Sequence, residues 1–354
     1  MKKILVISNT AFSIEKFRLH YLSLAIRYTF EIYTPNIKVI NYKKLKNINT
    51  FSFNNSNLLS EVFFLFNLIK KKNYQHVIVY SLKYQFLISI LKFFIKFKFI
   101  AVIAGTGSLM LITSLKFLLK QLYMFIINSS SKTIFINPYD KKDFINKRNF
   151  EKCELIPTEG IESIKYKVKN NKKINILFFA RIIKQKGILD YINTARILKK
   201  KYPQLNFYIA GPIKRFIVGQ SKPFNLTKEL KNENNIKYLG YINKYEKIYS
   251  KMDCLISPSL TEGAGTSVME ALQAGLFVIA YKNHGHQYVL SKTQNIICQQ
   301  NNVNSLVRSV EKYLTIPKSE LIKASNNSYK KIQANFITPI IAKKFIKIID
   351  KEFL

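Results

Sequence analysis

Short apolar runs alternate with longer stretches of helical periodicity along this chain of 354 residues, and the alternation occurs twice. It predicts βαβ units and therefore an α/β fold, with parallel sheets covered by helices. In the first half we expect helices near 15–28, 57–72, 84–97, 114–128 and 139–148. Strands are expected near 3–8, 30–34, 76–81, 98–104, 132–136 and 153–157, and in the second half near 174–180, 205–210, 236–239, 253–257, 277–281 and 295–298.

The chain is too long for one average hydrophobic core, which predicts two domains. The polar and basic segment Lys165–Lys173 lies in the expected linker, 158–173. We therefore expect one domain over 1–160, a second over 174–335 and a final segment over 336–354.

The cysteines and the first residues indicate the compartment. Cys153, Cys254 and Cys298 are scattered, without the spacing of a zinc site. The apolar part of Met1–Ser8 is too short for a signal peptide and is predicted to be a strand. A reduced, cytoplasmic location follows as the expectation.

Two glutamates, Glu262 and Glu270, lie eight positions apart in the segment 257–280, SPSLTEGAGTSVMEALQAGLFVIA. On one continuous helix this spacing would amount to about 12 Å of rise. Paired carboxylates that hydrolyse glycosides stand roughly 5–9.5 Å apart, so a hydrolase pair is disfavoured.

The residues around these glutamates favour an anion site. The run 253–257 is a candidate buried strand, and the turn 263–265 has a bare backbone that a ligand can approach closely. Thr266 or Ser267 then opens a predicted helix that stops near Gly275. Such a turn points free N–H groups and a positive helix dipole at one place.

A purely structural interpretation of the two glutamates remains open. The stretch Ser267–Glu270 also fits a capping box, in which Glu270 satisfies a backbone donor. Glu262 would then be an ordinary loop carboxylate.

A second cluster follows the strand expected at 174–180. Arg181 and Lys186 come just past the strand end, and Gly187 lies at the start of a helix. Two cations there can clamp a diphosphate, although a solvated basic turn has the same composition.

Together the two patterns, E-x7-E and A-R-x4-K-G, resemble those of retaining GT-B glycosyltransferases of family 4, bacterial surface-polysaccharide type. The resemblance implies two Rossmann-like domains with parallel sheets facing across a cleft, and a last helix, 336–353, crossing back to the first domain. It implies that Arg181 and Lys186 grip the donor diphosphate, that Glu262 contacts the donor sugar and that Glu270 holds the ribose. The remaining donor-binding candidates are Gly263, Gly265, Thr266, Ser267 and Gly211.

The implied activity is a hexosyltransferase-type transfer from a nucleotide sugar, with UDP as the expected carrier. The acceptor is a saccharide or a polyprenyl-linked saccharide in lipopolysaccharide, capsule or other surface-polysaccharide synthesis. The resemblance implies retention of configuration. No aspartate cluster stands out to bind a divalent ion, so neither a metal nor another cofactor is expected.

Fewer residues of the sequence point to an acceptor-binding site than to a donor-binding site. Arg18, after the first strand, and the glycine turn with Thr106 and Gly107 are candidates, and the histidine that other family members place near that turn is missing. For His284 and His286 we expect cleft lining or surface rather than a metal site, because no acidic residue lies near them in sequence.

The net charge of +37 points to an anionic partner. Between Val62 and Tyr139 there is no Asp or Glu. In the helix expected over Lys83–Lys98 a narrow polar stripe borders a wide apolar surface, and the stripe consists of Gln85, Ser89, Lys92 and Lys96. This pattern, repeated in Leu115–Ile127, favours peripheral contact with the anionic inner face of the cell membrane.

The sequence leaves three alternatives to a membrane-associated transferase. Drift in composition alone also produces a basic chain. No nucleic-acid motif is present and the lysines are spread over both halves, so a dedicated nucleic-acid partner is not expected. A nonenzymatic basic protein that binds nucleic acid or membrane is nevertheless the second alternative. A GT-B nucleotide-sugar epimerase is the third alternative.

Overall fold

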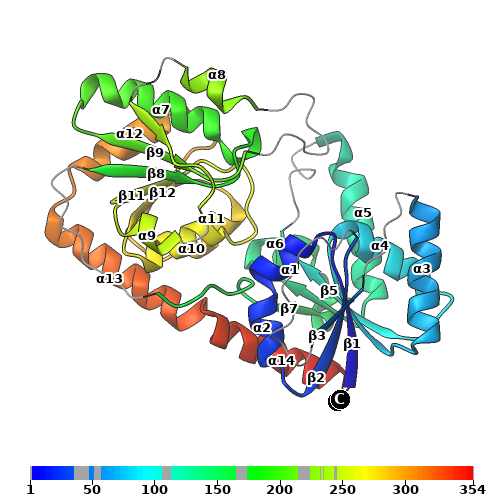
Figure 1. Cartoon of the computed structure of the whole chain (residues 1–354). Coiled ribbons are helices and arrows are strands. Elements are labelled where there is room, and N and C mark those ends of the chain that lie inside the picture. The colour runs from blue at the N-terminus through cyan, green and yellow to red at the C-terminus, as the bar shows by residue number, and fades with distance from the viewer. Residues whose placement is uncertain are drawn as a thin grey trace. The chain divides into compact units, whose positions relative to one another are not determined.

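The structure is a computed structural model and describes residues 2–35, 48–51, 57–105, 113–164, 174–213, 224–231, 233, 235–242 and 245–353. It divides into two units. The first combines Met1–Glu162 with Asn335–Leu354, and the second is Ser163–Ala334. Each unit is a parallel sheet with helices packed on it, as Figure 1 shows, so the predicted α/β fold is confirmed.

Within its described residues the first unit has a seven-stranded sheet in the order β3-β2-β1-β4-β5-β6-β7. Every strand pairs in parallel with its neighbours. The strands are β1 (Lys2–Ile7), β2 (Tyr28–Tyr33), β3 (Ile48–Phe51), β4 (His76–Tyr80), β5 (Lys98–Ile103), β6 (Lys132–Phe135) and β7 (Cys153–Leu155).

Helices cover both faces of this sheet because successive strand residues point to opposite sides. In β1, Ile4 and Val6 pack with α1, α2 and α14, whereas Leu5 and Ile7 pack with α3, α4 and α5 (Figure 1). The helical segments are α1 (Ala11–Phe17), α2 (Leu19–Leu24), α3 (Leu58–Lys71), α4 (Leu82–Leu91), α5 (Thr113–Ser129), α6 (Pro138–Phe144), the 3-10 turn η3 (Phe150–Lys152) and α14 (Thr338–Phe353).

The helix α14 belongs to the core of the first unit although it follows the second unit in the chain. Ile341, Phe345 and Ile349 are buried among residues of β1, β2 and α2. The Phe345 ring lies 4.8 Å from that of Tyr21, edge to face. The core on this side of the sheet is therefore built from both ends of the sequence.

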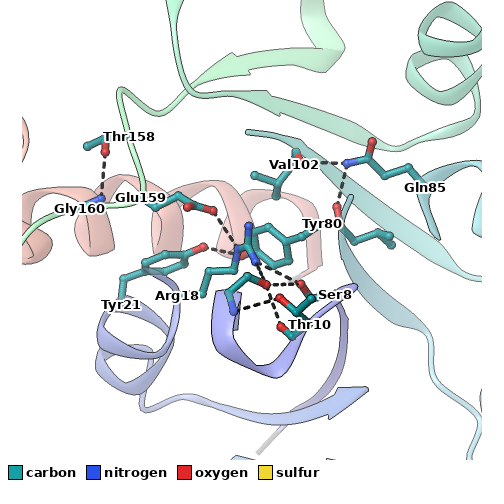
Figure 2. Close-up of polar contacts among 12 residues, drawn as sticks. Ser8, Thr10, Arg18, Tyr21, Tyr80, Gln85, Val102, Thr158, Glu159 and Gly160 are labelled. Atoms are coloured by element: carbon teal, nitrogen blue, oxygen red, sulfur yellow. Dashed lines mark hydrogen bonds and ion pairs between the residues drawn. The ribbon is translucent and has the colours of Figure 1, made fainter. Parts of the chain in front are cut away.

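The polar stripe predicted over Lys83–Lys98 lies only partly on the surface. Its polar residues Gln85 and Ser89 are buried, and Gln85 donates to the backbone carbonyls of Val79 and Val102 (Figure 2). The helix also ends at Leu91 rather than near residue 97. Gln85 thus faces the sheet, because backbone carbonyls there accept its hydrogen bonds. The other end of the predicted stripe, Lys92 and Lys96, is exposed.

Within its described residues the second unit has a six-stranded parallel sheet in the order β10-β9-β8-β11-β12-β13. Its strands are β8 (Asn175–Phe179), β9 (Asn206–Ala210), β10 (Ile236–Tyr238), β11 (Cys254–Ser257), β12 (Phe277–Tyr281) and β13 (Ile296–Cys298). Its helical segments are η4 (Lys184–Lys186), α7 (Ile188–Lys201), α8 (Leu226–Leu230), α9 (Tyr245–Tyr249), α10 (Thr266–Gln273), α11 (His284–Leu290), α12 (Val303–Leu314) and α13 (Lys318–Asn335).

In this sheet β8 and β11 are neighbours, so the segments that follow them emerge side by side at the carboxyl edge. That edge is where parallel α/β sheets bind ligands. Among the described helices of both units, none is long and apolar enough to cross a membrane.

Candidate functional site

The turn between β8 and α7 is pressed against the end of β11. Gly187, after η4, has a φ of +72°, and a Cβ built there would lie 2.1 Å from the Pro258 carbonyl oxygen. The Leu260 N–H donates to the Gln185 carbonyl at 3.0 Å. Only glycine fits this close approach, which fixes the η4 turn beside the loop that follows β11.

This contact brings two of the predicted residues together. The Lys186 ammonium lies 2.6 Å from a carboxylate oxygen of Glu262, and each side chain is 16% exposed. The Gly285 N–H, in the first turn of α11, donates to the Glu262 carbonyl at 3.2 Å. Glu262 is therefore held by its backbone and its side chain at once.

The charge state of Glu262 follows from these neighbours. Burial opposes ionisation of its carboxyl, but the Lys186 charge, the His286 ring and the hydrogen bond from Lys186 outweigh it and lower the pKa. At neutral pH the site accordingly holds a carboxylate and an ammonium side by side.

His286 lies beneath this pair and is 0% exposed, so the expectation that it lines a cleft or the surface is wrong. Its Nε2 lies 3.2 Å from the Ser257 hydroxyl, and its Nδ1 lies 2.8 Å from the Tyr281 carbonyl. Burial, only partly offset by Glu262, lowers the pKa of the ring, which favours the neutral form. Spacing along the chain does not predict this position, because Glu262 and His286 meet only through the fold.

The second glutamate lies on the buried side of α10. Glu270 is 7% exposed and accepts a hydrogen bond from the Tyr249 hydroxyl at 3.1 Å, which also donates to the Ser267 carbonyl. The residue that caps α10 is Gly265, with a φ of +74°. Ser267 is therefore not the N-cap, and the capping-box interpretation of Glu270 is wrong.

The other donor-site candidates surround the same edge. Gly263 lies in the loop before α10, and Thr266 and Ser267 form its first turn. Gly211 follows β9 and its N–H donates to the Gly240 carbonyl at 2.9 Å. Arg181 lies two residues past β8, is exposed and, among the described residues, forms no ion pair. A guanidinium in that position is available to an incoming anion.

In the first unit, Arg18 is buried at the junction of α1 and α2 (Figure 2). Its Nε donates to a Glu159 carboxylate oxygen at 2.8 Å, and Nη1 donates to the hydroxyls of Ser8 and Ser13. Its guanidinium carbon lies 4.1 Å from the centre of the Tyr80 ring. These contacts tie the ends of β1 and β4 to the segment after β7.

Two acceptor-side candidates, Thr106 and Gly107, lie outside the described residues. Among the residues that are described, no three or more His, Cys, Asp or Glu side chains gather as metal ligands would.

Comparison with known proteins finds a family match within the second half of the chain. Residues 161–331 match the family model "Glycosyl transferases group 1", and this segment contains Arg181, Lys186, Glu262 and Glu270. An uncharacterized glycosyltransferase of Haemophilus influenzae is 28% identical over 40% of the chain. N,N'-diacetylbacillosaminyl-diphospho-undecaprenol alpha-1,3-N-acetylgalactosaminyltransferase of Campylobacter jejuni is 25% identical over 51% of the chain. The matched segments span 40% and 46% of these relatives' own lengths.

Solved structures match the whole chain at low identity. Sucrose-phosphate synthase of Thermosynechococcus elongatus superimposes with a TM-score of 0.81 at 16% identity, over 100% of this chain and 99% of that one. Anabaena Alr3699/HepE, solved in complex with UDP-glucose, gives a TM-score of 0.76 at 16% identity, over 99% and 100%. The α/β fold with two parallel sheets is that of GT-B glycosyltransferase structures.

Proposed function

We propose that this protein is a glycosyltransferase that transfers a sugar from a nucleoside diphosphate, UDP, to a hydroxyl of a saccharide or lipid-linked saccharide. One observation carries the proposal. The Lys186–Glu262 pair lies at the carboxyl ends of β8 and β11, beside the amino end of α10 and within the matched segment.

The chemistry of the edge suits such a donor. The diphosphate of a nucleotide sugar is an anion, and Lys186, exposed Arg181 and the first turn of α10 present positive charge or N–H donors. The Anabaena protein of the same fold was solved with UDP-glucose, and the name of the Campylobacter relative specifies an undecaprenol-linked acceptor. These two proteins support the choice of donor and acceptor.

In the proposed reaction the bond between the anomeric carbon and the β-phosphate oxygen breaks, and a bond from that carbon to the acceptor oxygen forms. The acceptor proton passes to the departing diphosphate. Negative charge grows on that diphosphate, and Lys186, Arg181 and the α10 terminus are preorganised to stabilise it. We assign Glu262 to the donor sugar and Glu270 to the ribose hydroxyls.

Further features of the reaction belong to the same proposal. It proceeds with retention of configuration and without a metal, since protein cations neutralise the leaving group. The product enters lipopolysaccharide, capsule or another surface polysaccharide, and the enzyme works in the cytoplasm, peripheral to the cell membrane.

Calorimetric titration with UDP, GDP and CMP, for the wild type and Lys186→Ala, tests the donor site. We expect tight binding of one nucleotide and a loss of about 1.5–3 kcal/mol in the variant, the size of a charge-assisted contact. Thermal melting of both proteins checks that the variant is folded.

The matching variant Glu262→Ala separates the two roles. It removes a carboxylate from beside Lys186, so the affinity for the free nucleotide should not fall, whereas turnover of the nucleotide sugar should fall strongly. Equal losses of UDP and UDP-sugar affinity in both variants would contradict the assignments.

Two outcomes would replace the proposal altogether. Conversion of the nucleotide sugar without any acceptor would indicate an epimerase. Salt-sensitive binding of RNA, with no binding or turnover of any nucleotide sugar, would indicate a nonenzymatic basic protein.

A further inference from the structure

Large apolar side chains are exposed on the helical layer that α4 and α5 form on the first unit. Phe93 and Phe94, in the turn after α4, are 74% and 73% exposed. Phe117 and Leu118, in α5, are 69% and 63% exposed. We call the surface that these residues make the α4–α5 face, and it consists of Phe86, Phe93, Phe94, Leu115, Phe117 and Leu118.

Part of the α4–α5 face is continuous apolar surface around Phe125. The ring of Phe125, in α5, stacks on Phe93 with centroids 6.4 Å apart and meets the edge of Phe86 at 6.0 Å. Leu118 precedes Phe125 by seven residues, two helical turns, so both lie on one side of α5. Contiguous exposed apolar surface of this kind marks an interaction site.

The same layer is positively charged. From residue 57 to 131 the only acidic residue is Glu61, which is 4% exposed and paired with Lys83. The described part of this layer therefore exposes no carboxylate to offset its lysines. Exposed lysines lie next in sequence to residues of the α4–α5 face or within two positions of them, namely Lys92, Lys96, Lys116 and Lys120.

We propose that the α4–α5 face docks on the surface of an anionic lipid bilayer. The lysines meet the lipid phosphates, and Phe93, Phe94, Phe117 and Leu118 enter the boundary between headgroups and acyl chains. Charge complementarity favours an anionic bilayer as the partner of this face. The exposed lysines are positively charged, and the exposed apolar side chains gain free energy only when they move from water into an apolar phase.

The structure changes which side chains face the membrane. Two residues of the predicted polar stripe, Gln85 and Ser89, are buried, whereas Lys92 and Lys96 are exposed together with the rings in the turn after α4 and on α5. The docking proposal rests on the peripheral membrane location given in the proposed function, but it does not depend on the donor chemistry, since all of its residues belong to the first unit. A failure of vesicle binding would leave the donor site standing, and a failure of nucleotide binding would leave the docking surface standing.

Flotation of the full-length protein with vesicles tests the surface. The vesicles contain either equal parts of phosphatidylglycerol and phosphatidylcholine or phosphatidylcholine alone. We expect binding to the anionic vesicles only, and at least a tenfold loss of affinity in the double variants Phe93→Ser/Phe94→Ser and Phe117→Ser/Leu118→Ser. Nucleotide binding and thermal melting should match the wild type, because these side chains are exposed.

Charge and exposure have matched controls within the same unit. Lys116→Glu/Lys120→Glu should reduce binding at low salt by at least about tenfold, since each lysine contributes at a charged surface. Lys343→Glu/Lys344→Glu makes the same change of charge on α14, on the opposite face of the sheet, and should bind more tightly than the Lys116/Lys120 variant. Ile26→Ser, at a position 75% exposed after α2, should bind as the wild type does.

Several results would overturn the proposal. They are equal binding to neutral and anionic vesicles, no effect of either apolar double variant, or equal losses in the two charge variants. A dimer in solution that the Phe93/Phe94 change dissociates would assign the face to a second copy. Binding of RNA that the same change abolishes, without vesicle binding, would assign it to nucleic acid.

Discussion

At the scale of single residues, the site depends on how closely two turns approach. Gly187 and Gly240 have nearly the same φ, +72° and +75°, but among the described residues only Gly187 has a neighbour within 4 Å of a built Cβ. Gly240→Ala should therefore cost roughly 1–2 kcal/mol, the penalty of left-handed backbone. Gly187→Ala adds a clash with Pro258 and should cost clearly more.

Urea denaturation of both variants measures the difference, and titration with the nucleotide reports on the site. We expect only Gly187→Ala to weaken nucleotide binding, because it displaces the η4 turn and Lys186. Equal free energies of unfolding for the two variants would show that the turn moves without cost.

The sequence predicted which residues gather at this edge but not how they pair. Lys186 and Glu262 were each assigned to a ligand from local patterns, and their ion pair joins positions 76 apart. Spacing along the chain identifies the strand end that carries a side chain, not the neighbour it meets. For the same reason burial of Arg18 against Glu159 and of His286 beneath Glu262 had no signal.

At the scale of elements, one ammonium anchors the end of α11. The Lys331 Nζ, from α13, donates to the carbonyls of Tyr288, Val289 and Ser291 and to the Ser291 hydroxyl. Burial, helped by nearby Lys292, lowers the pKa of Lys331 to about 8. The other end of α11 carries Gly285, which contacts Glu262.

This pKa makes a signed prediction. An unfolded lysine keeps its proton until about pH 10.4, so between about pH 8 and that value the unfolded state binds more protons. The stability of the wild type should therefore rise with pH in this window, relative to Lys331→Met, which lacks the group. Urea denaturation at several pH values measures the difference, and a constant or falling difference would refute the assignment.

Most elements could be predicted because their apolar periodicity is strong. The strand β3 was missed, since Ile48–Phe51 is four residues long, of which Asn49 and Thr50 are polar, and pairs at the sheet edge. The helix expected over 15–28 is two helices, divided at Arg18. The burial of Gln85 escaped prediction because the backbone carbonyls that accept its hydrogen bonds come from β4 and β5.

At the scale of the whole molecule, the first unit depends on α14. Phe345 is 2% exposed and packs in the core beside Tyr21. Phe345→Ala should destabilise this unit by about 3–5 kcal/mol, whereas Lys347→Ala, exposed on the same helix, should change stability by less than about 0.5 kcal/mol. Hydrogen exchange measures each unit separately, and we expect faster exchange in β1 and β2 with little change in β8 and β11.

The same helix sets an order for folding during synthesis. The ribosome must translate the whole second unit after β7 before it reaches α14, which at about 5–20 residues per second takes on the order of ten to thirty seconds. During that interval the sheet face formed by Ile4, Val6, Phe30 and Ile32 has α1 and α2 but lacks the cover that α14 provides, while the second unit can already fold. The nascent first unit is thus the part of this protein for which chaperones have the longest opportunity to bind.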